Sequence, residues 1–303
     1  MTLHVDSSSE RAGIAATPGR NLTALLRGTK RFAVRKPLGA IGAAILLTFV
    51  VLALFAPLIA PYDPNLQIKS SILESPSSKH LLGTDQLGRD MLSRIIFGAR
   101  ISLFVSFIAV AFGAGVGTAV GLVSGYGPSA LDTLLQRVVD GMMAFPGFIL
   151  AMTIATVLGP GLFQVSFAIG VLQVPFVARV VRGSTLEVKT QAYMEAAQAT
   201  GAGPVEMLWR HVLPNVLPTV IVIATLGLGG AILAEAGLSF LGLGQGPRTP
   251  SWGLMLSGQA RSFMLVAPWL AIWPGLAITF TVLAFNLFGD ALRDVLDPRL
   301  RGT

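Results

Sequence analysis

The chain has 303 residues, of which 53% are hydrophobic and only 12% are charged, and its mean hydropathy is +0.71. A soluble domain must cover its surface with charge, so this composition excludes the soluble globular class and predicts a polytopic membrane protein. The lack of cysteine excludes disulfides and thiolate metal sites, and His4, His80 and His211 lack the spacing of metal ligands. The net charge is +7, and the basic residues lie beside apolar segments, which favours contact with membrane lipid over nucleic acid.

The apolar runs divide the chain into segments. Residues 1–21, rich in Ser, Ala and Gly, are expected to form a disordered cytoplasmic tail. Residues 22–37 mix leucines with cations, as an amphipathic helix on the membrane surface does. A spanning helix needs about 20 apolar residues, and six runs of that order occur at 38–60, 101–123, 142–158, 162–181, 216–241 and 266–289. The first run could also be a signal peptide, but it is long for one and has no clear small-x-small cleavage site.

Lysine and arginine set the expected orientation. With the N-terminus inside, most of the 22 lysines and arginines fall in cytoplasmic segments, although several crowd the extracytoplasmic segment 61–100. We therefore expect both termini in the cytoplasm, a core of five spans over residues 101–289 and a cytoplasmic tail over 290–303. The third and fourth runs are joined by Gly159-Pro160-Gly161, a tight turn that predicts two antiparallel neighbours.

Some residues inside the spans carry information of their own. Ionisable groups are expensive at membrane depth, so Glu235 in the fifth span and Asp140 at the inner end of the third are candidates for lining a translocation path. For Glu235, a structural role at a helix interface is the favoured alternative. Glycines at four-residue spacing predict a close-packed face on the second span, and prolines predict kinks. These residues are Gly113, Gly117, Gly121 and Gly125, and Pro146, Pro175 and Pro274.

A charged, helix-forming loop at about 182–215 lies between the fourth and fifth runs. It contains Glu195-Ala196-Ala197, then Gly201 after three intervening residues, then Leu213-Pro214, with His211 two residues before Leu213. This spacing resembles the EAA loop of the permease subunits of bacterial ABC importers, with His211 in a position that is aliphatic in the family. The composition around it predicts a helix, a glycine hinge and a second short helix. An ordinary solvated loop between spans is the alternative.

The resemblance implies that this loop docks on a nucleotide-binding subunit and couples ATP-driven closure to movement of the spans. The implied coupling residues are Tyr193, Glu195, Ala196, Ala197, Gly201, His211, Leu213 and Pro214. Glu195 is expected to pair with an arginine of the partner. Tyr193, Met194, Met207 and Leu208 are expected to fill an apolar groove on it.

Three further stretches resemble the smaller, C-type permease of the dipeptide, oligopeptide and nickel importers, and the likeness extends from about residue 38 to the end. The first stretch is Gly83-Thr84-Asp85-Gln86-Leu87-Gly88-Arg89-Asp90, followed by Ser93-Arg94 and Gly98-Ala99-Arg100-Ile101-Ser102-Leu103. The second is Leu238-Ser239-Phe240-Leu241-Gly242-Leu243-Gly244, followed by Pro250-Ser251-Trp252-Gly253. The third is Phe285-Asn286, Gly289-Asp290, Leu292-Arg293-Asp294 and Leu296-Asp297-Pro298-Arg299. One departure is Gln245-Gly246-Pro247, where relatives usually have Gln-Pro-Pro. It falls in an outer loop and bears on contact with a binding protein.

The resemblance implies an all-α integral membrane protein with six transmembrane helices of the type I ABC importer permease architecture, in the bacterial inner membrane. It further implies a heterodimer with a second permease, two ATPase subunits or domains, an extracytoplasmic solute-binding protein and a peptide as the solute. No GxxxxGK[ST] phosphate-binding motif occurs in the sequence. ATP and magnesium are therefore expected on the ATPase subunits, with no cofactor and no catalytic residue in this chain.

Other functions remain open at this stage. Importers of nickel chelates, glutathione and opine-like compounds share the same permease architecture. A secondary transporter would need carboxylates that bind coupling ions at the midplane and often inverted repeats, and Glu235 is the one candidate found. An intramembrane enzyme is disfavoured because the sequence has neither HExxH nor GxSxG.

Overall fold

The computed structural model describes residues 33–246, 248–257, 262–263 and 265–296. The predicted disordered tail, most of the predicted amphipathic surface helix and the last residues of the predicted C-terminal tail lie outside these ranges. The described part is helical and has no strand, apart from an isolated bridge between Thr84 and Asp90. Five of its helices are long and apolar enough to cross a membrane, and a bent helix pair completes a sixth span if it counts as one. The predicted all-α membrane architecture is confirmed.

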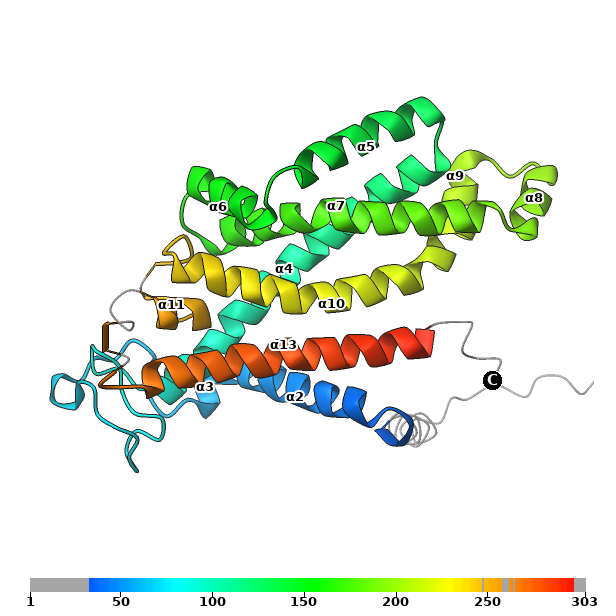
Figure 1. Ribbon diagram of the computed structural model, residues 1–303. Helices are drawn as coiled ribbons and strands as arrows, with labels where there is room; N and C mark the ends of the chain where they lie inside the picture. The colour runs from blue at the N-terminus through cyan, green and yellow to red at the C-terminus, as the bar shows by residue number, and fades with distance from the viewer. Residues whose placement is uncertain (1–32, 247, 258–261, 264, 297–303) are drawn as a thin grey trace, which may run out of the picture.

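The five long helices form one bundle (Figure 1). They are α2 (Pro37–Leu54), α4 (Met91–Tyr126), α7 (Leu162–Lys189), α10 (Leu213–Phe240) and α13 (Trp269–Leu296). The start of α2, the end of α13 and the short helix α8 (Ala192–Ala199) lie toward one end of the bundle. Lys36 and Asp294 form an ion pair of 2.6 Å at this end. The arrangement agrees with the expectation that both termini and the charged loop share one side of the membrane.

The opposite end carries a cap formed by the segment between α2 and α4, together with α11 (Trp252–Leu256) (Figure 1). The cap segment contains α3 (Ala56–Ile59) and a 3₁₀ turn, Lys69–Ser71. The Trp269 indole N–H at the start of α13 donates a 3.1 Å hydrogen bond to the carbonyl of Thr84. The Trp252 indole N–H of α11 donates to the Ile95 carbonyl of α4, also at 3.1 Å. Both bonds tie the cap to the bundle.

The glycine face of α4 packs on α7 of the same chain. A Cβ on Gly117 would lie 2.6 Å from the Cβ of Val177, and one on Gly121 would lie 2.7 Å from the carbonyl oxygen of Ala178. Gly113 and Gly125 meet α7 equally closely. The backbones approach because no side chain separates them. The predicted close-packed face is confirmed, and its partner, which the sequence left open, is α7.

The third predicted span, 142–158, differs in the structure. Its apolar part is α6 (Gly147–Leu158), and α5 (Ser129–Met143) precedes it at a bend of 88°. Twelve residues of α-helix are roughly 18 Å long, too short to cross a hydrocarbon core alone. Pro146 lacks an N–H group and disfavours helix at the preceding residue, so the chain turns there. The apolar run therefore corresponds to one half of a bent helix pair, α5 and α6.

Other helix ends also differ from the apolar runs. Helix α4 begins at Met91, ten residues before the predicted second span, because Asp90 caps its N-terminus by accepting a hydrogen bond from the Ser93 N–H. Helix α13 continues to Leu296, into the predicted tail 290–303. Pro175 and Pro274 lie inside α7 and α13 as expected. Apolar runs locate the hydrocarbon core, whereas caps and breakers decide where helices end.

Candidate coupling site

The spacing of the charged loop produces a specific helix ending. Helix α8 stops at Ala199, and Gly201 follows with a φ of +88°. The Gly201 N–H donates to the Gln198 carbonyl at 2.9 Å, and the Ala202 N–H donates to the Ala197 carbonyl at 3.2 Å. These two bonds define a Schellman motif, in which the glycine takes the left-handed position. Gly201 therefore ends α8 and lies between the two helical parts of the loop, at the position predicted for the glycine hinge.

Two methionines anchor the loop to the bundle. Met194 of α8 and Met207 after it are 1% and 0% exposed. Both belong to an apolar cluster with residues of α7 and of the start of α10, and Ala197 and Ala202 pack against it. The prediction that Met194 and Met207 fill a groove on a partner is thus wrong, because this chain already buries them. Their role is to hold α8 in place.

The other face of the loop is exposed. Glu195 and Ala196 are exposed on α8, and Tyr193 is 42% exposed. Beyond the glycine, Val205 and Trp209 are each 67% exposed. An aromatic and acidic surface supported by a buried anchor is suited to contact another protein.

The second half of the loop leads directly into a span. Helix α9 (Pro204–Glu206) continues as a π-helix, η2 (Met207–Val212), and then as α10. His211 and Leu213 are partly buried, and Pro214 lies in the first turn of α10, directly after the π-helical turn. The expected second short helix is therefore the cytoplasmic extension of α10, with a π-helical turn of the kind often found at functional sites.

The two candidate pathway residues have different surroundings. Glu235 is 1% exposed, and its carboxylate accepts hydrogen bonds from Ser102 of α4 at 2.9 Å and from Ser239 at 2.8 Å. It links helices inside this chain and faces no opening here. Asp140 on α5 is exposed and forms a 2.6 Å ion pair with Arg179 of α7.

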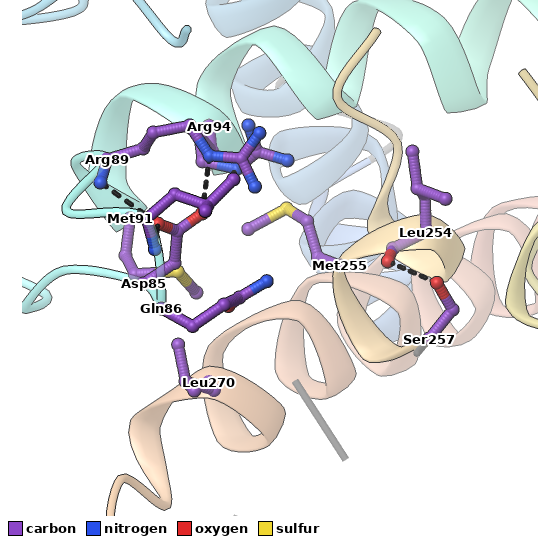
Figure 2. A pocket seen from close by; sticks show the side chains of 10 residues that line it. Asp85, Gln86, Arg89, Met91, Arg94, Leu254, Met255, Ser257 and Leu270 are labelled. Atoms are coloured by element: carbon purple, nitrogen blue, oxygen red, sulfur yellow. Dashed lines mark hydrogen bonds and ion pairs between the residues drawn. The ribbon is translucent and has the colours of Figure 1, made fainter. Parts of the chain in front are cut away.

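The cap contains a polar network that the sequence reasoning did not anticipate. Asp85 Oδ1 accepts hydrogen bonds from the backbone N–H groups of Leu87 and Arg89, and its Oδ2 accepts a 2.6 Å bond from Arg89 Nε. Arg94 Nε lies 3.6 Å from the same oxygen (Figure 2). Gly88, with a φ of +71°, completes the turn between them. The run from Gly83 to Asp90 is therefore a folded turn held by its own charges.

A second buried pair continues this network. His80 Nδ1 lies 2.9 Å from Asp90 Oδ1, and both side chains are almost fully buried. The ring of Tyr62 stacks on the His80 imidazole with centroids 5.0 Å apart. The alternation of Asp and Arg in the run was the signal available in the sequence, but the burial of these groups was not readable from it.

A bundle of apolar helices with an anchored helix–glycine–helix loop at one end and a polar cap at the other defines an integral membrane transport subunit. Residues 117–302 match the family described as binding-protein-dependent transport system inner membrane component. Residues 29–76 match the N-terminal TM domain of oligopeptide transport permease C. The chain belongs to the family of binding-protein-dependent inner membrane transport components.

Two relatives match this chain over most of their length. The chain is 44% identical over 269 residues to the glutathione transport system permease protein GsiD of Escherichia coli O6:K15:H31 and to that of Shigella sonnei, covering 88% of each chain. Among solved structures, the inward-facing MetNI methionine ABC transporter matches with a TM-score of 0.56 and 20% identity. That match covers 68% of this chain and 98% of the other, and it shows the fold alone.

The protein is thus a multi-pass permease subunit of an ABC importer in the inner membrane, as the EAA loop and the cap motifs indicated. Its role in the importer is transport across the membrane.

Proposed function

We propose that this permease carries peptides, in the size range of di- and oligopeptides. The match of the N-terminal region to the oligopeptide permease C model supports this class. The relatives named for glutathione, itself a small peptide, are compatible with it. Nickel chelates and opine-like compounds are the alternative solutes for the same architecture.

The importer has several parts, of which this chain supplies one. A second permease pairs with it as a heterodimer, and the two form the translocation pathway. Two ATPase subunits or domains bind ATP and magnesium and perform the hydrolysis, which is consistent with the lack of a GxxxxGK[ST] motif in this sequence. A solute-binding protein delivers the peptide at the cap, and this subunit has no catalytic residue of its own.

The exposed face of α8 is the observation that carries the coupling role. Because Met194 and Met207 fix α8 to α7 and α10, a force applied to Tyr193 or Glu195 reaches the spans. Glu195 is exposed and lies in the first turn of α8. It is placed to accept a charge-assisted hydrogen bond from an arginine of the ATPase. Loop contacts of this kind convert ATP-driven closure into rigid-body movement of helices.

The test is reconstitution of the whole importer. This chain is co-expressed with the neighbouring permease, ATPase and binding-protein genes, and uptake of a labelled peptide library into membrane vesicles is measured with and without ATP. We expect uptake to require ATP and the binding protein. Uptake that persists without nucleotide but collapses with the proton or sodium gradient would contradict the proposal. Uptake of nickel chelates in place of peptides would change the solute and leave the coupling role intact.

A matched pair of variants tests the coupling face. Glu195→Ala removes the exposed acid and is expected to lower uptake and solute-stimulated ATPase activity together. Glu206→Ala removes another acid of the same loop, but Glu206 already pairs with Arg210 of this chain at 2.5 Å, so transport is expected to continue. Equal effects of the two variants would argue against a specific contact at Glu195.

A further inference from the structure

A cavity of about 210 Å³ lies between the cap and the bundle, at the end opposite α8. Its walls come from the turn that starts at Asp85, the first residues of α4, helix α11 and the start of α13 (Figure 2). Drug-sized ligands occupy pockets of about 300–1,000 Å³. This cavity is smaller, so it fits a small molecule or one end of a longer one.

Two arginines and one aspartate form the polar wall of the cavity. Arg89 and Arg94 are 8% and 3% exposed, and Asp85 is 3% exposed. Asp85 already accepts hydrogen bonds from two backbone N–H groups and from the Nε of Arg89. The cavity wall therefore carries one more positive charge than negative charge.

Arg94 is the group with unused bonding capacity. A guanidinium has five N–H donors. Among the described residues, Arg94 donates one hydrogen bond, from Nη1 to the Pro64 carbonyl at 3.1 Å, and has the longer 3.6 Å approach to Asp85. A buried cation with spare donors beside a cavity favours an anionic ligand with two acceptor oxygens, because the planar fork binds a carboxylate through parallel hydrogen bonds.

The rest of the wall is mostly apolar and contains one unsatisfied amide. Met91, Met255 and Leu270 line it, and in Figure 2 Met255 faces the cavity between Arg94 and Gln86. The side-chain oxygen of Gln86 is buried and has no hydrogen-bond partner among the described residues. It could accept a hydrogen bond from an amide N–H or an ammonium group. The wall thus offers a place for a carboxylate, for an N–H donor and for a small aliphatic group.

We propose that this cavity binds the carboxylate end of the transported solute, with Arg94 as the main contact and Gln86 accepting an N–H from the next group. This inference rests on the proposed function for the class of solute. It adds a subsite in the permease itself, at the face where the solute is delivered.

The test measures binding without transport. The permease pair with its ATPases, but without the binding protein, is placed in lipid nanodiscs, and saturation-transfer NMR is recorded with alanyl-alanine and with its C-terminal amide. We expect transfer to the acid and at least five-fold less to the amide, with competition by sodium acetate but not by sodium chloride at equal ionic strength. Arg94→Met should remove the signal. Arg100→Met, which removes an exposed arginine from the same helix, should keep it.

A second variant guards against misassembly. Ser257→Phe fills the cavity at its partly exposed edge and leaves both arginines in place, and it should also remove the signal. Equal transfer to acid and amide, or a signal that survives both Arg94→Met and Ser257→Phe, would overturn the inference. A signal suppressed equally by chloride and acetate would show a general anion site and would also overturn it. None of these outcomes depends on ATP-driven uptake, so they are separate from failure of the proposed function.

Discussion

Replacing Gly201 by alanine tests whether the Schellman ending of α8 is needed for coupling. Gly201 has a φ of +88°, and a Cβ placed on it would meet nothing within 4 Å. The cost of the substitution is therefore a backbone cost alone, about 1–2 kcal/mol for an L-residue in left-handed conformation. That energy lowers the ratio of the native loop ending to its alternatives roughly 5- to 30-fold.

Gly203 provides the matched control. It has a φ of −73°, which any residue adopts, and it also has open space where a Cβ would lie. Gly203→Ala should be close to neutral, because the gain of about 0.4–1 kcal/mol from a less free unfolded chain is offset by the poorer N-cap that alanine provides for α9. Each of the two variants adds one methyl group to the protein, and the two positions lie two residues apart.

The assay is solute-stimulated ATPase activity and peptide uptake by the reconstituted importer, with assembly checked by size-exclusion chromatography. We expect Gly201→Ala to assemble and to lose coupling, with basal ATPase activity retained, while Gly203→Ala matches the unchanged protein. If the two variants behave alike, the helix ending does not matter for coupling and the reasoning from the left-handed glycine is refuted.

Three further predictions concern packing inside the chain. Gly117→Ala forces a methyl group into the α4–α7 contact and should lower the free energy of unfolding by about 1–3 kcal/mol. Gly115→Ala is the control, because a Cβ there would meet nothing within 4 Å. Similar melting temperatures for the two variants would count against close packing of α4 on α7. Glu235→Leu leaves two buried serine hydroxyls without their acceptor and should lower the free energy of unfolding by about 1–3 kcal/mol for each hydroxyl. Glu235→Gln should retain uptake. Loss of uptake in a well-assembled Glu235→Gln importer would instead favour a pathway role. Asp132→Asn weakens the two hydrogen bonds that Arg182 donates to it at 2.7 Å, and should loosen α5 and raise its hydrogen exchange; unchanged exchange would show that the pair does not hold α5.

Features that depend on neighbouring residues in the sequence could be predicted. The four-residue glycine spacing on α4 gives one helical face whatever the rest of the fold is, and that face is packed in the structure. The EAA spacing likewise places Gly201 where an eight-residue helix has to end. Five of the six apolar runs correspond to helices long enough to cross the membrane among the described residues.

Features that depend on distant partners could not be predicted. The apolar character of Met194 and Met207 indicated burial, but only the position of α7 shows that this chain and not a partner covers them. Arg94 meets the carbonyl of Pro64, which lies 30 residues earlier, so no local pattern reveals the pair. Pro146 was visible as a possible kink, but the size of the bend depends on how α5 rests on its neighbours.

The continuity of α9, η2 and α10 has a mechanical consequence. Together they form an unbroken helical stretch from Pro204 to Phe240, 37 residues in all, which is roughly 55 Å long at 1.5 Å per residue. If the stretch moves as one body, a tilt of about 10° around its middle displaces each end by roughly 5 Å in opposite directions. In the proposed coupling, a tilt imposed at the loop would therefore move the other end of α10, beneath the cap, without any signal having to pass from one side chain to the next.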